Sequence, residues 1–427
     1  MKAVEGWTTE QLGSVIKDIG DGGTPNTNKR EYFGGSIPWV VIQDIRKSIS
    51  TTKTTLTRLG LASCSAKLWP AGSVILSTGA TIGEVGLAEV PVATKQGIHG
   101  IVCKEEELSS QYLYYKLQTL REFLNANAQG STIREIRANF LRTISISFPT
   151  SKPEQIKIAE ILSTVDRAIE QTEAMIAKQQ RIKTGLMQDL LTRGIDEHGN
   201  LRSEQTHKFK DSLLGRISVE WEVATCISLC REIVVGIVIR PAQYYRPEGV
   251  PVLRSANVRE NEISDENLVY MSERDNEHLL KSQLHTGDLV TVRTGYPGTT
   301  SVVSPKYNGS NCVDIVISRP NHEKVRSGFL SIWVNSDHGK RQVLEGQGGL
   351  AQQHFNVGEM RSLLVKVPCL QEQERIEKTL KSQNEAMDGA LGMLYKFRSL
   401  KTALMQDLLT GKKRVTALLK DREVATL

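Results

Sequence analysis

Residues 183–192 read KTGLMQDLLT, and residues 401–410 read KTALMQDLLT. The two segments differ at a single position, where Gly185 stands against Ala403. A match this long does not arise by chance within one chain, so the segments are copies of one element. An internal repeat of this kind predicts a duplicated architecture.

The two copies extend upstream of the decapeptide in the same register, and looser matches continue through the rest of the chain. The close matches are Glu154-Gln155 with Glu372-Gln373, Ile158 with Ile376, Leu162 with Leu380, and Met175 with Met393. The looser ones are Trp7 with Trp221, Gly22 with Gly236, Ile37-Pro38 with Val250-Pro251, and Thr78-Gly79 with Thr294-Gly295. The chain is therefore interpreted as a tandem duplication, in which a variable globular region followed by a shared helix occurs twice.

Each shared segment is predicted to be one long helix. Ser151 to Glu154 fits a capping box with Pro153 in the first turn, and Arg193-Gly194 fits a helix end. The second helix is expected to begin near Gln371. Between these ends apolar residues recur at alternating spacings of four and three, which is typical of a coiled-coil seam. Because a single exposed apolar stripe of this length would aggregate, the two seams are predicted to pack on each other.

The repeated LMQDLL segment is interpreted as a pairing or docking element, since no chemistry needs its spacing. Residues assigned to helix pairing and subunit docking are Leu162, Val165, Ile169, Ile176, Leu186, Leu190, Leu380, Met387, Leu394, Leu404 and Leu408. Gly389 and Gly392 lie inside the second helix, where each costs about 1 kcal/mol relative to alanine. Both are therefore expected to mark close packing. The difference between Gly185 and Ala403 is expected to mark either a bend or closer packing in the first helix.

The globular regions combine short β-like runs with turn signals and helical stretches, so the predicted fold class is α+β. Two similar α/β domains are expected to be joined by two long antiparallel helices that form a coiled-coil spacer. Predicted strands lie at 37–42, 73–76, 144–148, 250–253, 288–292, 314–317 and 363–367, and predicted helical stretches at 112–126 and 329–344. The predicted domains are 1–150, a helix at 151–195, a linker at 196–216, a second domain at 217–368 and a helix at 369–427.

Polar loops recur at matching places in both halves, and they are the candidate binding elements. Residues 22–30 correspond to 239–246, residues 41–46 to 254–259, and residues 129–134 to 348–354. Arg, Asn and Gln are suited to the edges of bases, and Lys, Ser and Thr to phosphates. Any one such loop is typical of solvated surface, but recurrence with different side chains favours recognition of nucleic acid. The candidate DNA-binding residues are Thr24, Asn26, Asn28, Lys29, Arg30, Gln43, Arg46, Lys47, Thr78, Ser131, Thr132, Arg134, Arg240, Gln243, Tyr244, Tyr245, Arg254, Asn257, Arg259, Arg293, Tyr296, Gln352, Gln353 and His354.

The composition is that of a globular protein of more than one domain. The chain has 427 residues, 39% hydrophobic and 24% charged, with a net charge of +6. This modest positive charge is only weak evidence for a polyanionic partner. There is no apolar run of 18 residues and no signal peptide, so a cytoplasmic protein without a membrane span is expected. The six cysteines include no Cys-x-x-Cys pair, which favours free thiols over a zinc site.

Motifs of catalysis are missing from the sequence. It has no GxGxxG fingerprint, no P-loop, no HExxH, no GxSxG, and no Asn/Asp-Pro-Pro-aromatic tetrapeptide of amino-methyltransferases. The acidic run Glu105–Glu107 is interpreted as a solvated turn, and no metal site is predicted. A non-catalytic binding or assembly subunit is therefore favoured over an enzyme with an unfamiliar site.

The chain resembles the specificity subunit of type I restriction-modification systems along nearly its whole length. The resemblance rests on the twofold arrangement of variable and shared regions. It also rests on GGTPNTNKREYFGGSIPWV (22–40), LSTGATIGEVGL (76–87), EQIKIAEIL (154–162), HKFKDSLLGRISVEWEV (207–223) and LKTALMQDLLTGKKRV (400–415). LVTVRTGYPGTTSVV (289–303) is a looser version of the segment that begins LSTGATIG.

The resemblance implies a division of labour. Each globular domain is expected to recognise one half of a bipartite, asymmetric site on double-stranded DNA. The helices, about 58 Å long, are expected to set the spacer between half-sites and to dock two methyltransferase subunits. Two restriction subunits join where the system also cleaves DNA. The chain itself is expected to bind no cofactor, with S-adenosylmethionine on the methyltransferase and ATP and Mg²⁺ on the restriction subunit. The alternative is a duplicated coiled-coil adaptor without a nucleic-acid role.

Overall fold

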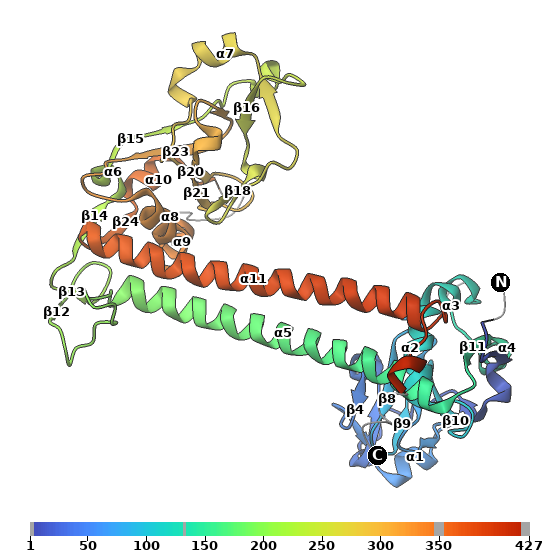
Figure 1. The fold of residues 1–427 in the computed structure, drawn as a ribbon. Helices are drawn as coiled ribbons and strands as arrows, with labels where there is room; N and C mark the ends of the chain where they lie inside the picture. The colour runs from blue at the N-terminus through green and yellow to red at the C-terminus, as the bar shows by residue number, and fades with distance from the viewer. Residues whose placement is uncertain (1–3, 131–133, 346–353, 420–427) are drawn as a thin grey trace. The chain divides into compact units, whose positions relative to one another are not determined.

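The computed structural model describes residues 4–130, 134–345 and 354–419, and the chain divides into two compact units (Figure 1). Unit 1 comprises Met1–Ala174 and Gly392–Leu427, and unit 2 comprises Met175–Leu391. The division falls within both long helices, α5 (Lys152–Thr192) and α11 (Leu370–Leu408). Each unit therefore contains one globular domain, the first part of the helix that follows it and the last part of the other long helix.

Unit 1 is built on three groups of strands. An antiparallel sheet has the order β2-β10-β7-β8, with β4 added in parallel to β8, and a second sheet has the order β5-β3-β9-β6. The first and last strands of the domain, β1 and β11, pair with each other. The strands are β1 (Trp7–Gln11), β2 (Ile16–Gly20), β3 (Phe33–Val40), β4 (Ser48–Ile49), β5 (Thr55–Leu56), β6 (Leu68–Trp69), β7 (Val74–Ser77), β8 (Val85–Ala88), β9 (Val92–Thr94), β10 (Ile98–Cys103) and β11 (Ser145–Pro149). The helices are α1 (Arg58–Ala62), α2 (Ser110–Thr119), α3 (Arg121–Asn127) and α4 (Ala138–Thr143).

Unit 2 repeats this topology. Its main sheet has the order β15-β23-β20-β21, a second sheet has the order β19-β16-β22, and β14 pairs with β24. The strands are β12 (Phe209–Lys210), β13 (Ile217–Ser218), β14 (Glu222–Thr225), β15 (Cys230–Val235), β16 (Val250–Leu253), β17 (Val258–Arg259), β18 (Glu262–Ile263), β19 (Val269–Met271), β20 (Leu289–Val292), β21 (Thr300–Val302), β22 (Asn311–Cys312), β23 (Ile315–Pro320) and β24 (Leu364–Val367). The helices are α6 (Cys226–Leu229), α7 (Glu273–His278), α8 (Ser327–Asn335), α9 (Asp337–Glu345) and α10 (Val357–Ser362).

The correspondence between the units extends to strand direction. β3 runs parallel to β9 and antiparallel to β5, and β16 likewise runs parallel to β22 and antiparallel to β19. The shared order and directions confirm the predicted α+β class and the duplication. Two predictions of a single helix were wrong. The stretch expected at 112–126 is two helices, α2 and α3, with Leu120 between them at φ −94° and ψ 2°. The stretch expected at 329–344 is also two helices, α8 and α9, because Ser336 between them is extended, with φ −71° and ψ 166°.

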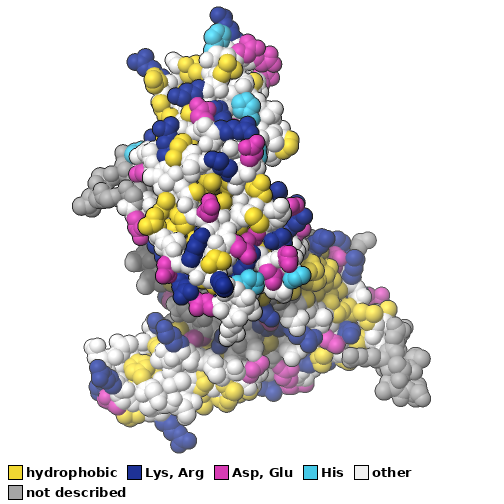
Figure 2. All heavy atoms as spheres, turned by 90° about the vertical axis from the view of Figure 1, so that its left-hand side faces the viewer, with side chains coloured by type: hydrophobic (Ala, Val, Ile, Leu, Met, Phe, Trp, Pro, Cys, Tyr) yellow, Lys and Arg dark blue, Asp and Glu magenta, His cyan; other side chains and the backbone are white. Residues whose placement is uncertain are grey.

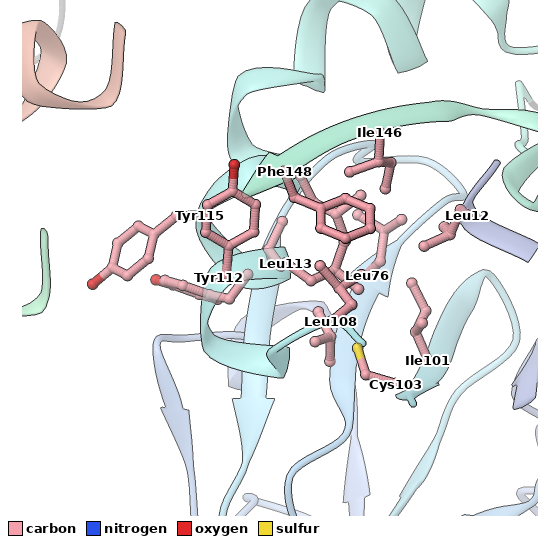
Figure 3. Close-up of a cluster of buried hydrophobic side chains, with 14 of the residues drawn as sticks. Leu12, Leu76, Ile101, Cys103, Leu108, Tyr112, Leu113, Tyr115, Ile146 and Phe148 are labelled. Atoms are coloured by element: carbon pink, nitrogen blue, oxygen red, sulfur yellow. The ribbon is translucent and has the colours of Figure 1, made fainter. Parts of the chain in front are cut away.

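Each domain core closes over a long helix. In unit 1, Tyr112 and Leu113 of α2 pack on Leu76 and Ile101 of the main sheet (Figure 3), and Leu162 of α5 belongs to the same cluster. In unit 2, α8 takes the place of α2. Its Phe329 and Leu330 pack with Leu289, Val316 and Leu380 of α11. The apolar seams of the helices are thus shared between helix pairing and the domain cores.

A buried glutamine near the start of each long helix ties it to its own domain. Gln155 accepts a hydrogen bond from the Ser109 amide at 2.8 Å and donates to the Pro149 carbonyl at 2.8 Å. Gln373 accepts from the Arg326 amide at 2.8 Å and donates to the Pro368 carbonyl at 2.9 Å. In both units the amide side chain therefore joins the helix, the last strand and the segment that opens α2 or α8.

The neighbouring glutamate is neutralised by an arginine from beyond the end of the other long helix. Glu154 accepts from Arg414 at 2.6 Å and 2.7 Å, and its side chain is completely buried. Glu372 pairs with Arg202 and also accepts from Trp221 Nε1 at 3.0 Å. The sequence predicted that Glu154 would form a capping box with Ser151. In the structure its carboxylate instead accepts hydrogen bonds from Arg414. The start of one long helix and the end of the other thus meet in each unit, so the helices are antiparallel.

Further polar contacts join the two helices within each unit. Arg398 pairs with Glu173 at 2.6 Å in unit 1, and the side chains of Gln179 and Gln383 are hydrogen-bonded in unit 2. The expected helix stop at Arg193-Gly194 is confirmed, since Gly194 has φ +79°. A Cβ on Gly194 would lie 2.5 Å from the Trp221 ring, so no other residue fits there.

The expectation that glycines inside the helices mark close packing was wrong. A Cβ placed on Gly185, Gly389 or Gly392 would have no neighbour within 4 Å. Side chains at these positions face open space. The change from Gly185 to Ala403 is therefore a difference in helix propensity and not in packing.

Gly185→Ala is expected to stabilise unit 2 by about 1 kcal/mol, because alanine loses less backbone entropy than glycine in a helix. Chemical denaturation followed by circular dichroism measures the change. The matched variant is Ala403→Gly, which should destabilise unit 1 by a similar amount. A destabilising Gly185→Ala would show that the position is packed.

Glu372→Ala is expected to destabilise unit 2 by about 3–5 kcal/mol, because the buried Arg202 guanidinium loses its buried carboxylate partner and keeps only the exposed Glu220. The midpoint of thermal unfolding measures the loss. Glu374→Ala is the control on the same helix, since Glu374 is 42% exposed and pairs only with Lys378 in the described part of the chain. Equal effects of the two variants would contradict the role given to Glu372.

Candidate nucleic-acid interface

One end of the main sheet carries matching hairpin loops in the two units. In unit 1 the Gly83 amide donates to the Ser77 carbonyl at 2.9 Å, and in unit 2 the Gly298 amide donates to the Val292 carbonyl at 3.0 Å. Both glycines have positive φ, at 91° and 86°. The loops are thus of equal length, and Thr78 corresponds to Arg293. The sequence match of Thr78 with Thr294 was wrong by one residue. It was based on the Thr-Gly pair that both loops contain, whereas the strand register matches Thr78 with Arg293.

A second segment returns to the same loop in each unit. The Ile136 amide donates to the Thr78 carbonyl at 2.8 Å, and the Phe355 amide donates to the Arg293 carbonyl at 2.9 Å. Ile136 and Phe355 follow the polar stretches 129–134 and 348–354. The candidate residues Ser131, Thr132, Gln352 and Gln353 lie outside the described residues. The residues that follow these stretches are nonetheless fixed at corresponding places, as the sequence pairing of the two stretches requires.

The segment after the first sheet strand passes close to the second sheet in both units. The Gly23 amide donates to the Thr94 carbonyl at 2.9 Å, and the Ile237 amide donates to the Cys312 carbonyl at 2.9 Å. A Cβ on Gly22 would lie 2.2 Å from the Thr94 carbonyl oxygen, and one on Gly236 would lie 2.6 Å from that of Cys312. This close approach explains why glycine occurs at both positions. The polar residues that follow are thereby brought to the loop end of each domain.

Short turns complete the loop end. The Asp44 carboxylate accepts from the Val41 amide at 3.0 Å, and the Asn257 side chain accepts from the Arg254 amide at 3.1 Å. The sequence pairing of 41–46 with 254–259 is thus confirmed as one turn motif. In unit 1 this turn borders a hollow of about 200 Å³ with Gln43, Thr81, Lys95 and Gln96 in its lining.

Sequence reasoning missed Lys95 and Gln96. Both are exposed at the turn between β9 and β10, just before Gly97, which has φ 81°. The TKQG turn is a polar signal between two apolar strands, but the corresponding turn in the second half is one residue shorter and carries Val313 and Asp314 instead. A search that relied on recurrence could not find it.

Most of the candidate residues are exposed at or near this loop end. In unit 1 these are Thr24, Asn26, Asn28, Lys29, Arg30, Gln43, Arg46 and Arg134, and in unit 2 they are Arg240, Gln243, Arg259, Tyr296 and His354. Tyr296 is 84% exposed at the tip of the hairpin loop, and Val238 and Ile239 are exposed beside Arg240. Tyr244 and Tyr245 are half-buried and pack on the second sheet of unit 2.

Other candidates are held by protein groups. Thr78 is buried, with its hydroxyl 2.7 Å from His99 Nδ1, and Asn257 is buried and donates to the Ser264 and Glu266 carbonyls. Arg293 pairs with Asp314. The remaining two are Arg254, which bonds the Asn267 carbonyl, and Lys47, which bonds Ser163 of α5. These side chains shape the loops, and their roles as DNA contacts stay predictions.

The helix residues proposed for pairing and docking lie on the packed sides of α5 and α11. Leu162, Val165, Leu190, Leu380, Leu394 and Leu408 are buried, and Ile169, Ile176, Leu186, Met387 and Leu404 are half-buried. Several apolar helix residues outside that set remain exposed, namely Ile156, Met175, Ile182, Leu391, Met393, Tyr395 and Leu400. Their apolar side chains are the part of the helix surface that is open to a partner.

Charge is mixed over the visible surface. On the face drawn in Figure 2, Lys and Arg side chains are interspersed with Asp and Glu, without a large area of one sign. Among the described residues there is no cluster of three or more His, Cys, Asp or Glu that could hold a metal ion, and no helix long and apolar enough to cross a membrane.

The cysteines of the described residues are unbridged. Cys103, Cys226, Cys230 and Cys312 are buried, Cys64 is half-buried and Cys369 is exposed. The sulfur atoms of Cys226 and Cys230 lie 3.9 Å apart.

Burial at the loop end lowers the pKa of His99 below its usual 6.5, although the nearby carboxylates of Asp21 and Glu135 act in the opposite direction. His99 is 3% exposed, and the Asp21 carboxylate lies 3.8 Å from its Nδ1. The Asp21 carboxylate also accepts from the Gly22 and Gly97 amides, both at 2.8 Å. The neutral imidazole is therefore part of the packing beneath the hairpin loop.

The low pKa of His99 predicts a loss of stability in acid. The folded protein binds this proton less readily than the unfolded chain, so the contribution is complete above pH 6.5 and falls as pH decreases through that value. His99→Gln should remove this part of the pH dependence of the unfolding midpoint between about pH 7.5 and about pH 5. His198→Gln, at an exposed site, should leave it unchanged. An unaltered slope in His99→Gln would contradict the assignment.

Comparison with known proteins shows that the sequence is similar to specificity proteins of type I restriction systems. Residues 4–179 match the family model described as Type I restriction modification DNA specificity domain. The chain is 34% identical over 217 residues to the type I restriction enzyme MjaIX specificity subunit of Methanocaldococcus jannaschii, and that match spans about half of each protein (49%). With the MjaVIII specificity subunit of the same organism it is 24% identical over 434 residues, which cover 97% of this chain and 95% of the relative.

The fold has solved counterparts. The S subunit of a type I restriction-modification system from M. genitalium matches with a TM-score of 0.58 at 15% identity, covering 96% of this chain and 97% of that one. A chain from work on complex assembly and conformational transition of the type I R-M system matches with a TM-score of 0.59 at 17% identity, covering 96% and 99%. At these identities the likeness concerns the fold.

Proposed function

Because this chain belongs to the family of type I restriction-modification specificity subunits, we propose that it is the DNA-recognition subunit of such a complex. Each globular domain recognises one half of a bipartite, asymmetric site on double-stranded DNA. The chain itself carries no catalytic step. The relatives named above are specificity subunits, and none of them supports the alternative of an adaptor without a nucleic-acid role.

The observation that carries this proposal is the pair of matching loop ends with different side chains. Thr81 in the hairpin loop of unit 1 corresponds to Tyr296 in unit 2, and the turn before β10, which carries Lys95 and Gln96, corresponds to the turn before β23, which carries Val313 and Asp314. Backbone hydrogen bonds fix both loops in the same way. One scaffold that presents two different polar surfaces is suited to two different base sequences.

The remaining subunits supply the chemistry. Two methyltransferase subunits, which carry S-adenosylmethionine, dock on the long helices, and restriction subunits that use ATP and Mg²⁺ join where the system also cleaves DNA. The exposed apolar side chains of Ile156, Ile182 and Leu391 give the helices surface for such docking.

Independent domains predict independent half-sites. Exchange of residues 1–150 for those of a homologue should change one half of the methylated sequence and leave the other half intact. Methylation of a randomised duplex pool by the exchanged chain with its methyltransferase, followed by sequencing, measures the result. If both halves changed together, the two domains would not act independently.

Lys95 and Gln96 are predicted to differ in their effects on DNA binding. Gln96→Ala should relax preference at one base pair by about 1–3 kcal/mol, whereas Lys95→Ala should weaken binding to all sequences and lower the salt dependence by about one phosphate contact. Binding titrations at several salt concentrations separate the two. Lys17→Ala is the control, because Lys17 lies on β2 and pairs with Glu106. Loss of base preference in the lysine variant alone would reverse the assignment.

The length of the helix pair is proposed to set the number of unspecified base pairs between the half-sites. Because Gln179 bonds Gln383, an insertion in one helix would displace this pair, so the test inserts four residues after each of these positions. The insertion adds about 6 Å. A longer spacer in the methylated sequence is expected. An unchanged spacer would contradict the proposal that helix length sets the spacer.

A further inference from the structure

One buried carboxylate in unit 1 joins four elements. Asp166 of α5 is 6% exposed, and its Oδ2 accepts from the Tyr115 hydroxyl of α2 at 2.6 Å. Lys401 of α11 approaches its Oδ1 at 2.7 Å, and Lys47 approaches its Oδ2 at 3.4 Å. Lys401 also lies 5.9 Å from the centre of the Tyr115 ring. The two ammonium groups and the phenol satisfy a charge that would be costly to bury alone.

Lys47 connects this cluster to the loop end. It is the last residue of the 41–47 segment, which is closed by Asp44 and presents Gln43 and Arg46 to solvent. Its ammonium also donates to the Ser163 hydroxyl at 3.0 Å. Asp166 and Ser163 thus hold one end of this segment on α5, while Gln43 lines the hollow at the other end.

The corresponding place in unit 2 has lost the cluster. In the repeat register Lys401 corresponds to Lys183 and Asp166 to Asn384. Tyr115 corresponds to Ile332, because Ser109 bonds Gln155 in the way that Arg326 bonds Gln373. Lys183, Ile332 and Asn384 line one hollow of about 370 Å³. No hydrogen-bond partner for Asn384 Oδ1 occurs among the residues that the structure describes.

Lys47 has changed as well. The turn motif aligns it with Glu260, which pairs with Lys340 of α9 and not with a long helix. The carboxylate and two of its partners therefore differ together between the copies, whereas the lysine inside the repeated decapeptide is kept. This is expected of a linked set, since a carboxylate at 384 would meet Ile332 in place of the Tyr115 phenol and would have no ammonium group in the place of Lys47.

We propose that Asp166 is a positioning residue for recognition by unit 1, which fixes the 41–47 segment through Lys47, and that unit 2 positions its corresponding segment without this device. The proposal rests on the proposed function, and it identifies the chain's two recognition domains as unequally coupled to the helices. It also gives Lys47 a role other than contact with DNA phosphate.

The test uses Asp166→Asn in the full chain, purified with its methyltransferase partner. Asparagine fits the same place in unit 2, so the variant is expected to fold. Discrimination in one half of the target should fall about tenfold, the size of one mispaired contact, and the other half should be unchanged. Methylation of a randomised duplex pool, followed by sequencing, measures both halves at once. Thermal unfolding checks that the variant is folded.

Three matched variants sharpen the result. Asp166→Glu keeps the carboxylate and should restore most of the discrimination. Tyr115→Phe removes one hydrogen bond and no charge, so it should give a smaller loss in the same half. Asn384→Asp, at the corresponding place in unit 2, should leave recognition of the first half-site unchanged.

Two outcomes would overturn the proposal. In the first, Asp166→Asn binds all duplexes as tightly as the wild type or more tightly, with unchanged discrimination. Lys47 would then be a contact to DNA phosphate, and Asp166 would pair with it only in the absence of DNA. Equal losses in both halves would show a general effect on stability. A wild-type complex without any sequence preference would instead contradict the proposed function itself.

Discussion

Each unit depends on a buried glutamate at the start of one long helix and on the arginine beyond the end of the other that neutralises it. Glu154 with Arg414 and Glu372 with Arg202 are the two copies of this arrangement. A buried carboxylate without its partner is strongly destabilising, so neither helix can be set in place without the other. The duplicated sequence therefore folds as two units, each of which contains parts of both repeats.

This constraint explains what the copies share and where they differ. The residues that join each long helix to its own domain are repeated, as the glutamines Gln155 and Gln373 show with nearly the same hydrogen bonds. The loop ends are held by backbone hydrogen bonds, which do not specify the side chains they present. Polar surfaces can then diverge in each domain without disturbing the core. The cluster around Asp166 is the exception, because there the buried residues differ between the two units and one of them, Lys47, belongs to the 41–47 segment of the loop end.

Much of the fold could be predicted from the sequence because its signals are local or repeated. The seam of α5, the glycine stop at Gly194 and the strand at 250–253 follow from periodicity and turn chemistry. Other features depend on distant partners. The register of Thr78 with Arg293 is fixed by strand pairing, and Gly389 faces open space, which no single sequence reveals. Likewise Asn257 and Lys47 have polar side chains typical of DNA contacts, but the fold engages them internally.

The central claim is that one scaffold presents two different recognition surfaces to one DNA duplex. The most direct measurement is the set of sequences that the chain and its methyltransferase modify in a randomised duplex pool, read by sequencing of methylated bases. The account predicts two short specified half-sites of different sequence, separated by a fixed number of unspecified base pairs. One continuous specified site, or modification without sequence preference, would contradict it.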